Sequence, residues 1–257
     1  MAGRKNPVEQ TSPNCKMIKF VISSNKHSTI MKKTLFVISI LASILLFSSH
    51  DLRAGKPFEG VITYKISYPD SKFTESQLAM FPKIVTVMIK GTKAKTEYQT
   101  NMGSQTEISD YAEKTKIALI NMMGQKFAIK QSGEEIEKEN AKEPKATIEL
   151  SGETKVISGY TCKKATVTQN DDGVKTSFDV FYSSELGSKL ANFDNPVYKD
   201  IDGVLMEFSM KTPQISMKFT ASSVEKKGIA AKEFEIPADY TLTTKEELRS
   251  KFGGGME

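Results

Sequence analysis

Histidine, tryptophan and cysteine are scarce in this chain of 257 residues, which contains two His, two Cys and no Trp. His27, His50 and Cys15 lie before residue 55, so residues 55–257 contain no His and a single Cys, Cys162. Catalytic systems of the Ser/His/Asp and Cys/His types require an imidazole base, and many metal sites require an imidazole ligand. The composition therefore excludes these sites from residues 55–257, and the single Cys excludes a disulfide within them.

Long apolar runs are also scarce, and the one that stands out covers residues 35–47. Lys32 and Lys33 precede it, and a polar tail ending at Ala54 follows it. A basic head, a short apolar run and a small residue at the end are typical of a secretory signal peptide. The run is shorter than the roughly 18 to 20 apolar residues that a membrane-spanning helix needs. We therefore predict a cleaved signal peptide over residues 31–54 and an exported product, periplasmic or associated with the outer membrane.

Residues 1–30 precede the predicted signal peptide, although an export signal is expected to come first in a chain. We therefore predict that they are an N-terminal extension from a start codon assigned too early, and that Gly55 begins the mature protein. Residues 1–54 carry eight Lys/Arg and two acids, a net charge of +6, and taking this +6 from the whole-chain +5 leaves −1 for the rest. Nucleic-acid binding requires an excess of basic charge, so no nucleic acid is an expected partner.

The rest of the chain shows short alternating runs separated by Gly, Asn and Asp at intervals of roughly 8 to 12 residues, which is typical of antiparallel β-proteins. In residues 61–68, Ile62, Tyr64 and Ile66 fall on one face and alternate with polar residues. One side of this strand is therefore expected to be buried and the other side exposed to solvent. We predict that residues 55–257 form a single, β-rich domain.

Polar segments between the strands are expected to hold the helices and loops. Thr74 begins a capping-box pattern that predicts a short helix, and Thr243 begins a second one with Glu246. Residues 131–145 are too charged for a core element, so we expect a mobile loop there. Residues 233–236 are expected to form the last strand.

The most apolar hairpin of the sequence spans residues 204–211 and 215–224. Alternate positions of each strand place its large apolar side chains on one face. Methionine adapts to irregular apolar shapes, so these faces are a candidate ligand-binding surface. The alternative is ordinary sheet core, since any half-buried strand shows an alternating apolar face. The candidate ligand-binding residues are Met206, Phe208, Met210, Ile215, Met217 and Phe219.

Four short motifs carry a resemblance to a known family. They are FEG at 58–60, ISGYTCKKA at 157–165, GVLME at 203–207 and FEIP at 234–237. With these motifs the chain resembles an exported bacterial family classed as a domain of unknown function, DUF4412, which is similar to the LolA type of lipoprotein carrier. The resemblance implies a mainly β fold, with a curved antiparallel sheet or partly open β-barrel, two or three short helices and an apolar concavity. It implies no established activity.

Several residues invite a chemical role but have simpler explanations. Cys162 lies in a predicted strand, where Lys163 and its other neighbour point to the opposite face, so a packed and inert thiol is expected. Asp200 and Asp202 resemble the start of a calcium loop that lacks its later ligands, so a turn is expected. Nothing in the sequence brings two carboxylates together as glycosidases require. We therefore expect no catalytic residue, no metal ion and no cofactor.

Together these features favour an exported, non-enzymatic protein that binds an apolar ligand, such as a lipid, an acyl chain or a lipidated partner protein. Each methylene buried on the candidate surface is worth about 0.8 kcal/mol. Peripheral association with the outer membrane is compatible with this function. The alternatives are a structural or interaction protein of the cell envelope with a fully packed sheet, and a carboxylate-dependent hydrolase.

Overall fold

The structure, a computed structural model, describes most of the unit that begins at Gly55. The predicted N-terminal extension and signal peptide lie outside the described residues. None of the helices in the described part of the chain is long and apolar enough to span a membrane. The described ranges are 57–100, 103–122, 124–171, 174–211 and 215–252.

Within these ranges the chain forms twelve strands, three α-helices and two 3-10 helices. The strands are β1 (Glu59–Ser67), β2 (Ile84–Lys90), β3 (Lys93–Thr100), β4 (Gly103–Asp110), β5 (Thr115–Met122), β6 (Gln125–Gln131), β7 (Ala146–Ile157), β8 (Tyr160–Asp171), β9 (Val174–Ser183), β10 (Val204–Lys211), β11 (Ser216–Lys226) and β12 (Thr241–Thr243). The helices are α2 (Glu75–Leu78), α3 (Gly133–Asn140), α4 (Lys245–Phe252), η1 (Lys189–Asn192) and η2 (Ala231–Phe234).

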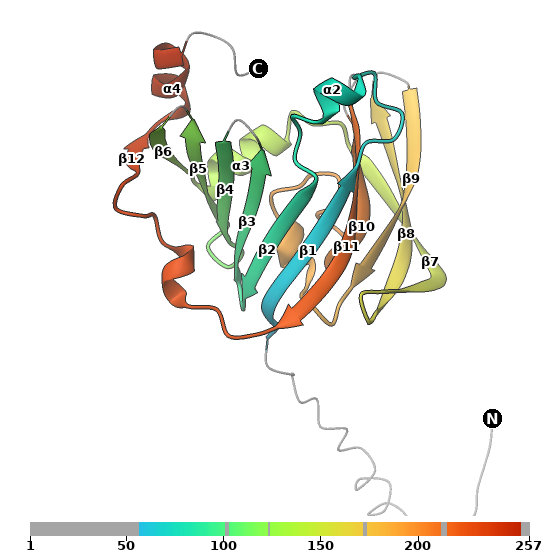
Figure 1. Cartoon of the computed structure of the whole chain (residues 1–257). Helices are drawn as coiled ribbons and strands as arrows, with labels where there is room; N and C mark the ends of the chain where they lie inside the picture. Colours follow the sequence, from blue (N-terminus) through green and yellow to red (C-terminus); the bar gives the residue numbers. More distant parts are fainter. Residues whose placement is uncertain (1–56, 101–102, 123, 172–173, 212–214, 253–257) are drawn as a thin grey trace, which may run out of the picture. The chain divides into compact units, whose positions relative to one another are not determined.

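All twelve strands belong to one sheet, in the order β12-β6-β5-β4-β3-β2-β1-β11-β10-β9-β8-β7 (Figure 1). β7 and β12 are its two edges, so the sheet is not closed. Neighbouring strands are antiparallel except for β12, which pairs parallel to β6. The predicted fold class, a mainly β protein with a curved, open sheet and two or three short helices, is confirmed. The parallel edge strand is an addition that the alternating pattern did not indicate.

Local sequence explains the strands and their turns. Ile62, Tyr64 and Ile66 of β1 are buried in one core cluster, as their alternation predicted.

β7 and β8 are joined by a tight turn. They pair up to Ile157 opposite Tyr160, which leaves two residues in the turn. Its central residues, Ser158 and Gly159, both have positive φ, at 49° and 86°. Type I′ hairpin turns require positive φ at both positions, and their twist matches that of the strands.

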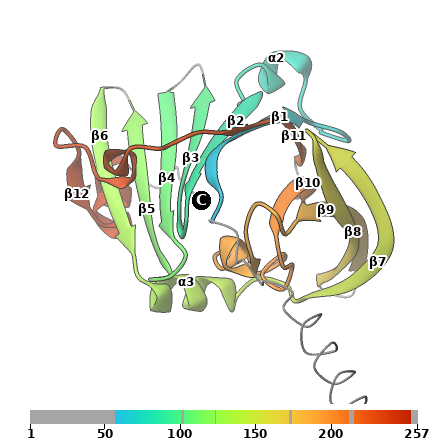
Figure 2. The same cartoon turned by 90° about the horizontal axis from the view of Figure 1, so that it is seen from below.

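The concave side of the sheet differs between its two ends (Figure 2). We call β7–β10 the packed half, because these strands curl around the chain that joins β9 to β10, residues 184–203, here named the plug segment. Tyr198 and Ile201 of the plug segment are 1% and 0% exposed and pack with buried residues of β8, β9 and β10. We call β2–β6 the open half, because these strands form a flatter wall that the plug segment covers only at its near side.

The convex side of the open half is covered by the C-terminal segment. Ile108 and Leu119 point away from the concave face and form a cluster with Ile229 and Phe234, which follow β11. Glu59 of β1 holds the start of this segment, because its Oε1 accepts a hydrogen bond of 2.7 Å from the backbone N–H of Ile229. The segment then reaches β6, where β12 adds to the sheet edge.

Two expectations for polar segments are wrong. The expected mobile loop at residues 131–145 contains α3, whose N-cap, Ser132, forms a capping box with Glu135. Ile136 of this helix is buried, and Glu137 and Glu139 form ion pairs with Lys114 and Lys245, so a cap, an apolar contact and two ion pairs hold this highly charged segment. The expected last strand at residues 233–236 overlaps the 3-10 helix η2, because Phe234 turns inward to the convex cluster.

The helix predicted from Thr74 is confirmed as α2, with its capping box formed by Thr74 and Gln77. The C-terminal helix is also present, but its box is shifted by one residue. Thr244 and Glu247 exchange the two hydrogen bonds, at 3.1 and 3.2 Å, while Thr243 belongs to β12. The presence of this helix was therefore easier to predict than the residue at which the helix begins.

Candidate functional site

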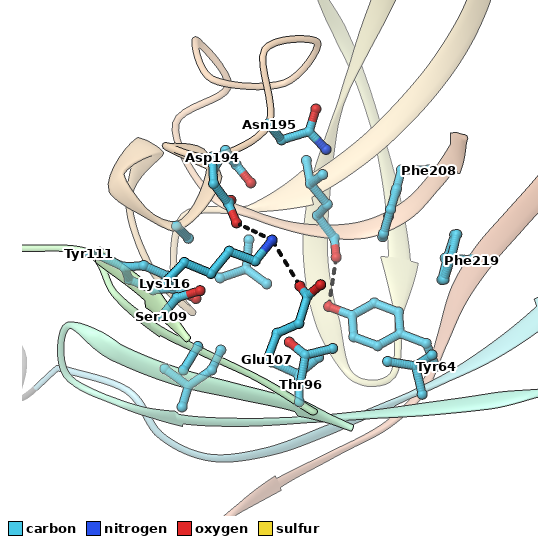
Figure 3. Close-up of a pocket in the computed structure, with 18 of the residues that line it drawn as sticks. Tyr64, Thr96, Glu107, Ser109, Tyr111, Lys116, Asp194, Asn195, Phe208 and Phe219 are labelled. Carbon is cyan, nitrogen blue, oxygen red and sulfur yellow. Dashed lines mark hydrogen bonds and ion pairs between the residues drawn. The ribbon is translucent and has the colours of Figure 1, made fainter. Parts of the chain in front are cut away.

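A cavity of about 330 Å³ lies on the concave face, between the wall of β2–β5 and the near end of the plug segment (Figure 3). We call it the concave cavity. Its lining also includes residues of β1, β10 and β11, so strands far apart in the sequence contribute to one space. It therefore exists only because the sheet curves and brings β10 opposite β3 and β4.

One part of this lining is apolar. Val85, Val87 and Ile89 alternate along β2 and therefore point to the same side of the sheet. Phe208 of β10 stacks on its cross-strand partner Phe219 of β11, with ring centroids 4.8 Å apart and an interplanar angle of 4°. Aliphatic and aromatic walls of this kind are typical of pockets that bind small apolar molecules.

Tyr64 holds the base of the apolar wall in place. Its hydroxyl donates a hydrogen bond of 2.8 Å to the backbone carbonyl of Leu205, which ties β1 to β10 across the concave side (Figure 3). Its ring meets Phe208 edge-on, with centroids 6.1 Å apart. Burial raises the pKa of Tyr64, so its hydroxyl stays neutral. This side chain is therefore part of the frame of the cavity.

The opposite part of the lining is charged. Lys116 Nζ lies 3.0 Å from Glu107 Oε2 and 3.1 Å from Asp194 Oδ2 (Figure 3). The β4–β5 register sets Lys116 opposite Ser109 and puts it on the same face as Glu107, whereas Asp194 comes from the plug segment. We call Glu107, Lys116 and Asp194 the charged triad. Their side chains are 20–24% exposed, so water reaches them only partly.

The electrostatics of the charged triad keep Lys116 protonated. Burial by itself lowers the pKa of Lys116, but the charges of Glu107 and Asp194 outweigh it, and the net effect is a raised pKa. A lysine acts as a nucleophile or base only when its amine is neutral at the working pH. The geometry therefore favours a binding or structural role for Lys116.

Two tyrosines flank the charged triad within the cavity lining. Burial raises the pKa of Tyr98 and of Tyr111, and the nearby carboxylates, Glu107 for the first and Asp194 for the second, raise it further. Both hydroxyls therefore stay protonated. Neither has a hydrogen-bond partner among the described residues. Each is available to donate to, or accept from, a molecule in the cavity.

A second cavity of about 330 Å³ adjoins the charged triad on its other side, between β4–β6 and α4. Glu107 and Lys116 line both cavities. Ala118, Ile129 and Leu248, of which Leu248 is 3% exposed, supply the apolar part of the second lining. The lining also contains polar and charged side chains, those of Gln105, Gln131, Lys245 and Arg249. The second cavity is therefore less apolar than the β2 side of the concave cavity.

The candidate residues of the apolar hairpin separate into two sets. Phe208, Met210 and Phe219 line the concave cavity. Met206 does not line it and is fully buried in the core cluster that also contains Phe219, while Met217 is partly buried against the same cluster. Ligand binding by the first set stays a prediction.

A shift in strand register explains the position of Met206. Leu205 pairs with Tyr182 and Glu207 pairs with Phe181, so Met206 is an extra residue between two successive pairs. Such a bulge redirects side chains and breaks the simple alternation on which the prediction relied. Ile215, which directly precedes β11, is buried and does not line the cavity either.

Sequence reasoning missed the charged triad and the two tyrosines beside it. Glu107 lies in β4, whose side chains are polar apart from that of Ile108, and Lys116 is a charged residue at the start of β5, so both look solvent-exposed. The one usable signal was that Lys116 shares its period-2 face with Ala118 and Ile120, which is apolar. Asp194 could not be found in this way, because it lies in irregular chain and reaches the site only through the tertiary fold.

The other candidate groups have structural positions. Cys162 is fully buried, as expected for a packed thiol, and burial raises its pKa. Asp202 Oδ1 accepts a hydrogen bond of 2.9 Å from the backbone N–H of Lys189, which ties the two ends of the plug segment together. The described residues contain no group of three or more His, Cys, Asp or Glu side chains placed to hold a metal ion.

The fold and the site define a class: a mainly β protein with one open, strongly curved sheet and a lined cavity on its concave face. Within that class, the family model described as "Domain of unknown function (DUF4412)" matches residues 58–195. This match spans more than half of the chain, and the chain therefore belongs to the DUF4412 family, as its motifs predicted. The matched region includes β1–β9 and reaches Asp194. A comparison with curated proteins finds no match. Similarity to the LolA type of carrier stays a prediction.

Proposed function

We propose that this protein binds an apolar ligand in the concave cavity, with the hydrocarbon part of the ligand against the β2 wall and the Phe208–Phe219 pair. The observation that carries the proposal is the cavity itself, about 330 Å³ in volume and lined on one side by aliphatic and aromatic side chains. Ligand pockets are typically about 300–1,000 Å³, largely apolar, with a few polar groups that orient the ligand. A volume at the lower end of this range suits a single acyl chain or a small hydrophobic molecule.

A non-enzymatic role agrees with the chemistry of the site. Lys116 is held in its charged form by two carboxylates, and the thiol of Cys162 is buried away from the cavity. Catalysis would need a group whose pKa is matched to proton transfer or nucleophilic attack at neutral pH. The polar groups of the lining are better suited to orienting a ligand.

The signal peptide expected over residues 31–54 extends this proposal to the cell envelope. An exported binder in the periplasm, or at the outer membrane, meets lipids and lipidated proteins. The proposed partners are therefore a hydrophobic small molecule or the acyl chain of a lipidated protein, in keeping with the resemblance of the family to lipoprotein carriers.

Blocking the cavity tests the proposal. Thr96 lies on the cavity side of β3, and Thr86 lies on the opposite side of β2 and is likewise half-buried. We expect T96F to fill the cavity and to reduce the binding of N-phenyl-1-naphthylamine, a neutral apolar fluorescent probe, at least about tenfold, whereas T86F binds like the wild type. Circular dichroism of both variants checks that the sheet is intact.

The alternative of a packed envelope protein predicts a different result. If the wild-type protein from residue 55 on binds no apolar probe, and native mass spectrometry finds no bound lipid after purification, the binding proposal is wrong. Equal loss of probe binding in T96F and T86F would also contradict it, because the effect would then not depend on the cavity.

A further inference from the structure

The charge of the concave cavity restricts the polar end of its ligand. Three of the described residues that line it are charged: Glu107, Lys116 and Asp194. Two carboxylates and one ammonium give this group a formal net charge of −1. The group is mostly shielded from water, so its interaction with a ligand charge is stronger than at an open surface. An anionic end would add to the negative charge, whereas a cationic end would neutralise it.

The free hydrogen-bond acceptors of the lining also favour a cationic ligand end. Lys116 already donates to both carboxylates. Asp194 Oδ2 takes the bond from Lys116, and its Oδ1 has no hydrogen-bond partner among the described residues. The hydroxyls of Tyr98 and Tyr111 also have free acceptor lone pairs. A ligand end with several N–H donors would therefore find acceptors in the carboxylate and the two hydroxyls.

Aromatic rings in the lining add to this preference. Tyr98 and Tyr111 lie near the carboxylates, and Phe208 and Phe219 form the adjoining wall. The faces of aromatic rings are electronegative and attract ammonium groups, more so where water is excluded. The apolar wall and the charged triad are thus parts of one lining that suits a molecule with a hydrocarbon body and a cationic end.

We propose that the ligand of the concave cavity is a single-chain amphiphile with a protonated amine at its polar end, which lies between Asp194, Tyr98 and Tyr111 while the chain lies against β2. This inference rests on the proposed function, since it concerns the same cavity. In this arrangement the charged triad selects ligands by their charge, and Lys116 holds the two carboxylates in position.

Ligands that share one chain and differ in charge test the inference. Decylamine is cationic at neutral pH, decanol is neutral and decanoate is anionic. Each is added to the protein from residue 55 on, below its aggregation concentration, and its affinity is measured by displacement of N-phenyl-1-naphthylamine. We expect decylamine to bind at least about tenfold more tightly than decanoate, with decanol between them. The preference should weaken as salt increases.

A pair of variants locates the selectivity. D194N removes one negative charge from the lining of the cavity. D200N also removes one negative charge, but from an exposed part of the plug segment. We expect D194N to reduce the affinity for decylamine about tenfold and to leave decanol binding within twofold of the wild type. D200N should bind all three compounds like the wild-type protein.

The outcomes separate the two proposals. If decanol and the neutral probe bind but decanoate binds as tightly as decylamine, the amine inference is wrong while the binding function stands. An equal loss of all three compounds in D194N also overturns the inference, since Asp194 would then act only on the fold. If no decyl compound and no neutral probe binds the wild-type protein, both proposals fail.

Discussion

The packed half and the open half of the sheet are built from the same kind of strand but differ in what lies against their concave sides. In the packed half, β8 presents Ala165 and Val167, which are fully buried, and the plug segment fits against them with Tyr198 and Ile201. In the open half, β3–β5 present polar and charged side chains such as Lys116, and the plug segment meets them only at its near side, where Asp194 pairs with Lys116.

This difference shows how one curved sheet provides both stability and a binding site. Burial of apolar area supplies most of the stabilisation of a domain, and the packed half concentrates it in a region closed by the chain itself. The open half is stabilised from its convex side by the C-terminal segment, so its concave face can remain partly uncovered. A cavity is retained where the fold does not depend on filling it.

The largest expected effect comes from placing a charge in the core beside the cavity. Met206 is fully buried, so M206D would bury a carboxylate without a partner and should reduce the free energy of unfolding by more than about 4 kcal/mol, enough to prevent folding. Met210, on the same strand, is 43% exposed and lines the cavity. M210D should fold. Urea denaturation followed by circular dichroism measures both, and a stable M206D would contradict the assignment of Met206 to the core.

A smaller effect is expected from truncating one tyrosine in each half. Tyr198 contacts the rings of Phe178 and Phe208 and donates a hydrogen bond to the carbonyl of Ser209. Y198A should lower the free energy of unfolding by about 3–5 kcal/mol, because it opens a void in the packed half. Y98A removes a ring that already borders a cavity and should cost about 1–2 kcal/mol. Equal costs in urea denaturation would show that the two halves are packed alike.

The smallest effect concerns an ion pair of the packed half, at Glu207. Burial by itself raises the pKa of Glu207, but hydrogen bonds from Lys155 and Lys218, at 2.9 and 3.2 Å, outweigh it and leave the pKa below its usual 4.5. A lowered folded-state pKa contributes stability that is fully present above pH 4.5 and is lost as the pH falls through the folded-state value.

Replacing Glu207 by glutamine tests this pH dependence. E207Q should reduce the free energy of unfolding by about 1 kcal/mol at neutral pH, since the two lysines remain partly exposed and can be hydrated. The difference from the wild type should vanish in acid, as measured by urea denaturation at several pH values. D179N, which weakens an exposed pair with Lys164, is the control and should have a smaller effect. A difference that persists unchanged in acid would assign the cost to packing.

The predictions from sequence succeeded where local patterns were sufficient. The alternation in β1 and the spacing of turn residues predicted a mainly β domain, and the capping box at Thr74 predicted α2. The short motifs predicted the family, and the curved sheet was implied by that resemblance. They failed at α3 and η2, where a buried side chain, Ile136 or Phe234, and ion pairs with other elements hold the local structure. Such contacts depend on distant strands, which local propensity does not describe.

The lining of the concave cavity was predicted only in part, for the same reason. Phe208, Met210 and Phe219 reach the cavity because the β10–β11 register keeps their alternation. Met206 does not reach the cavity, because a bulge that no sequence pattern indicated places it in the core. The charged triad combines residues of β4, β5 and the plug segment, and a charged residue in an alternating strand usually faces water.

The amino-acid sequence alone determined which chemistry is available: strands with one apolar face, a chain without histidine after residue 55, and the family to which the protein belongs. The tertiary structure alone decided where the apolar face is filled and where it is open. The physical reason is that filling depends on the course of the plug segment, whose Tyr198 and Ile201 close one half of the sheet and whose Asp194 meets Lys116 at the border of the other.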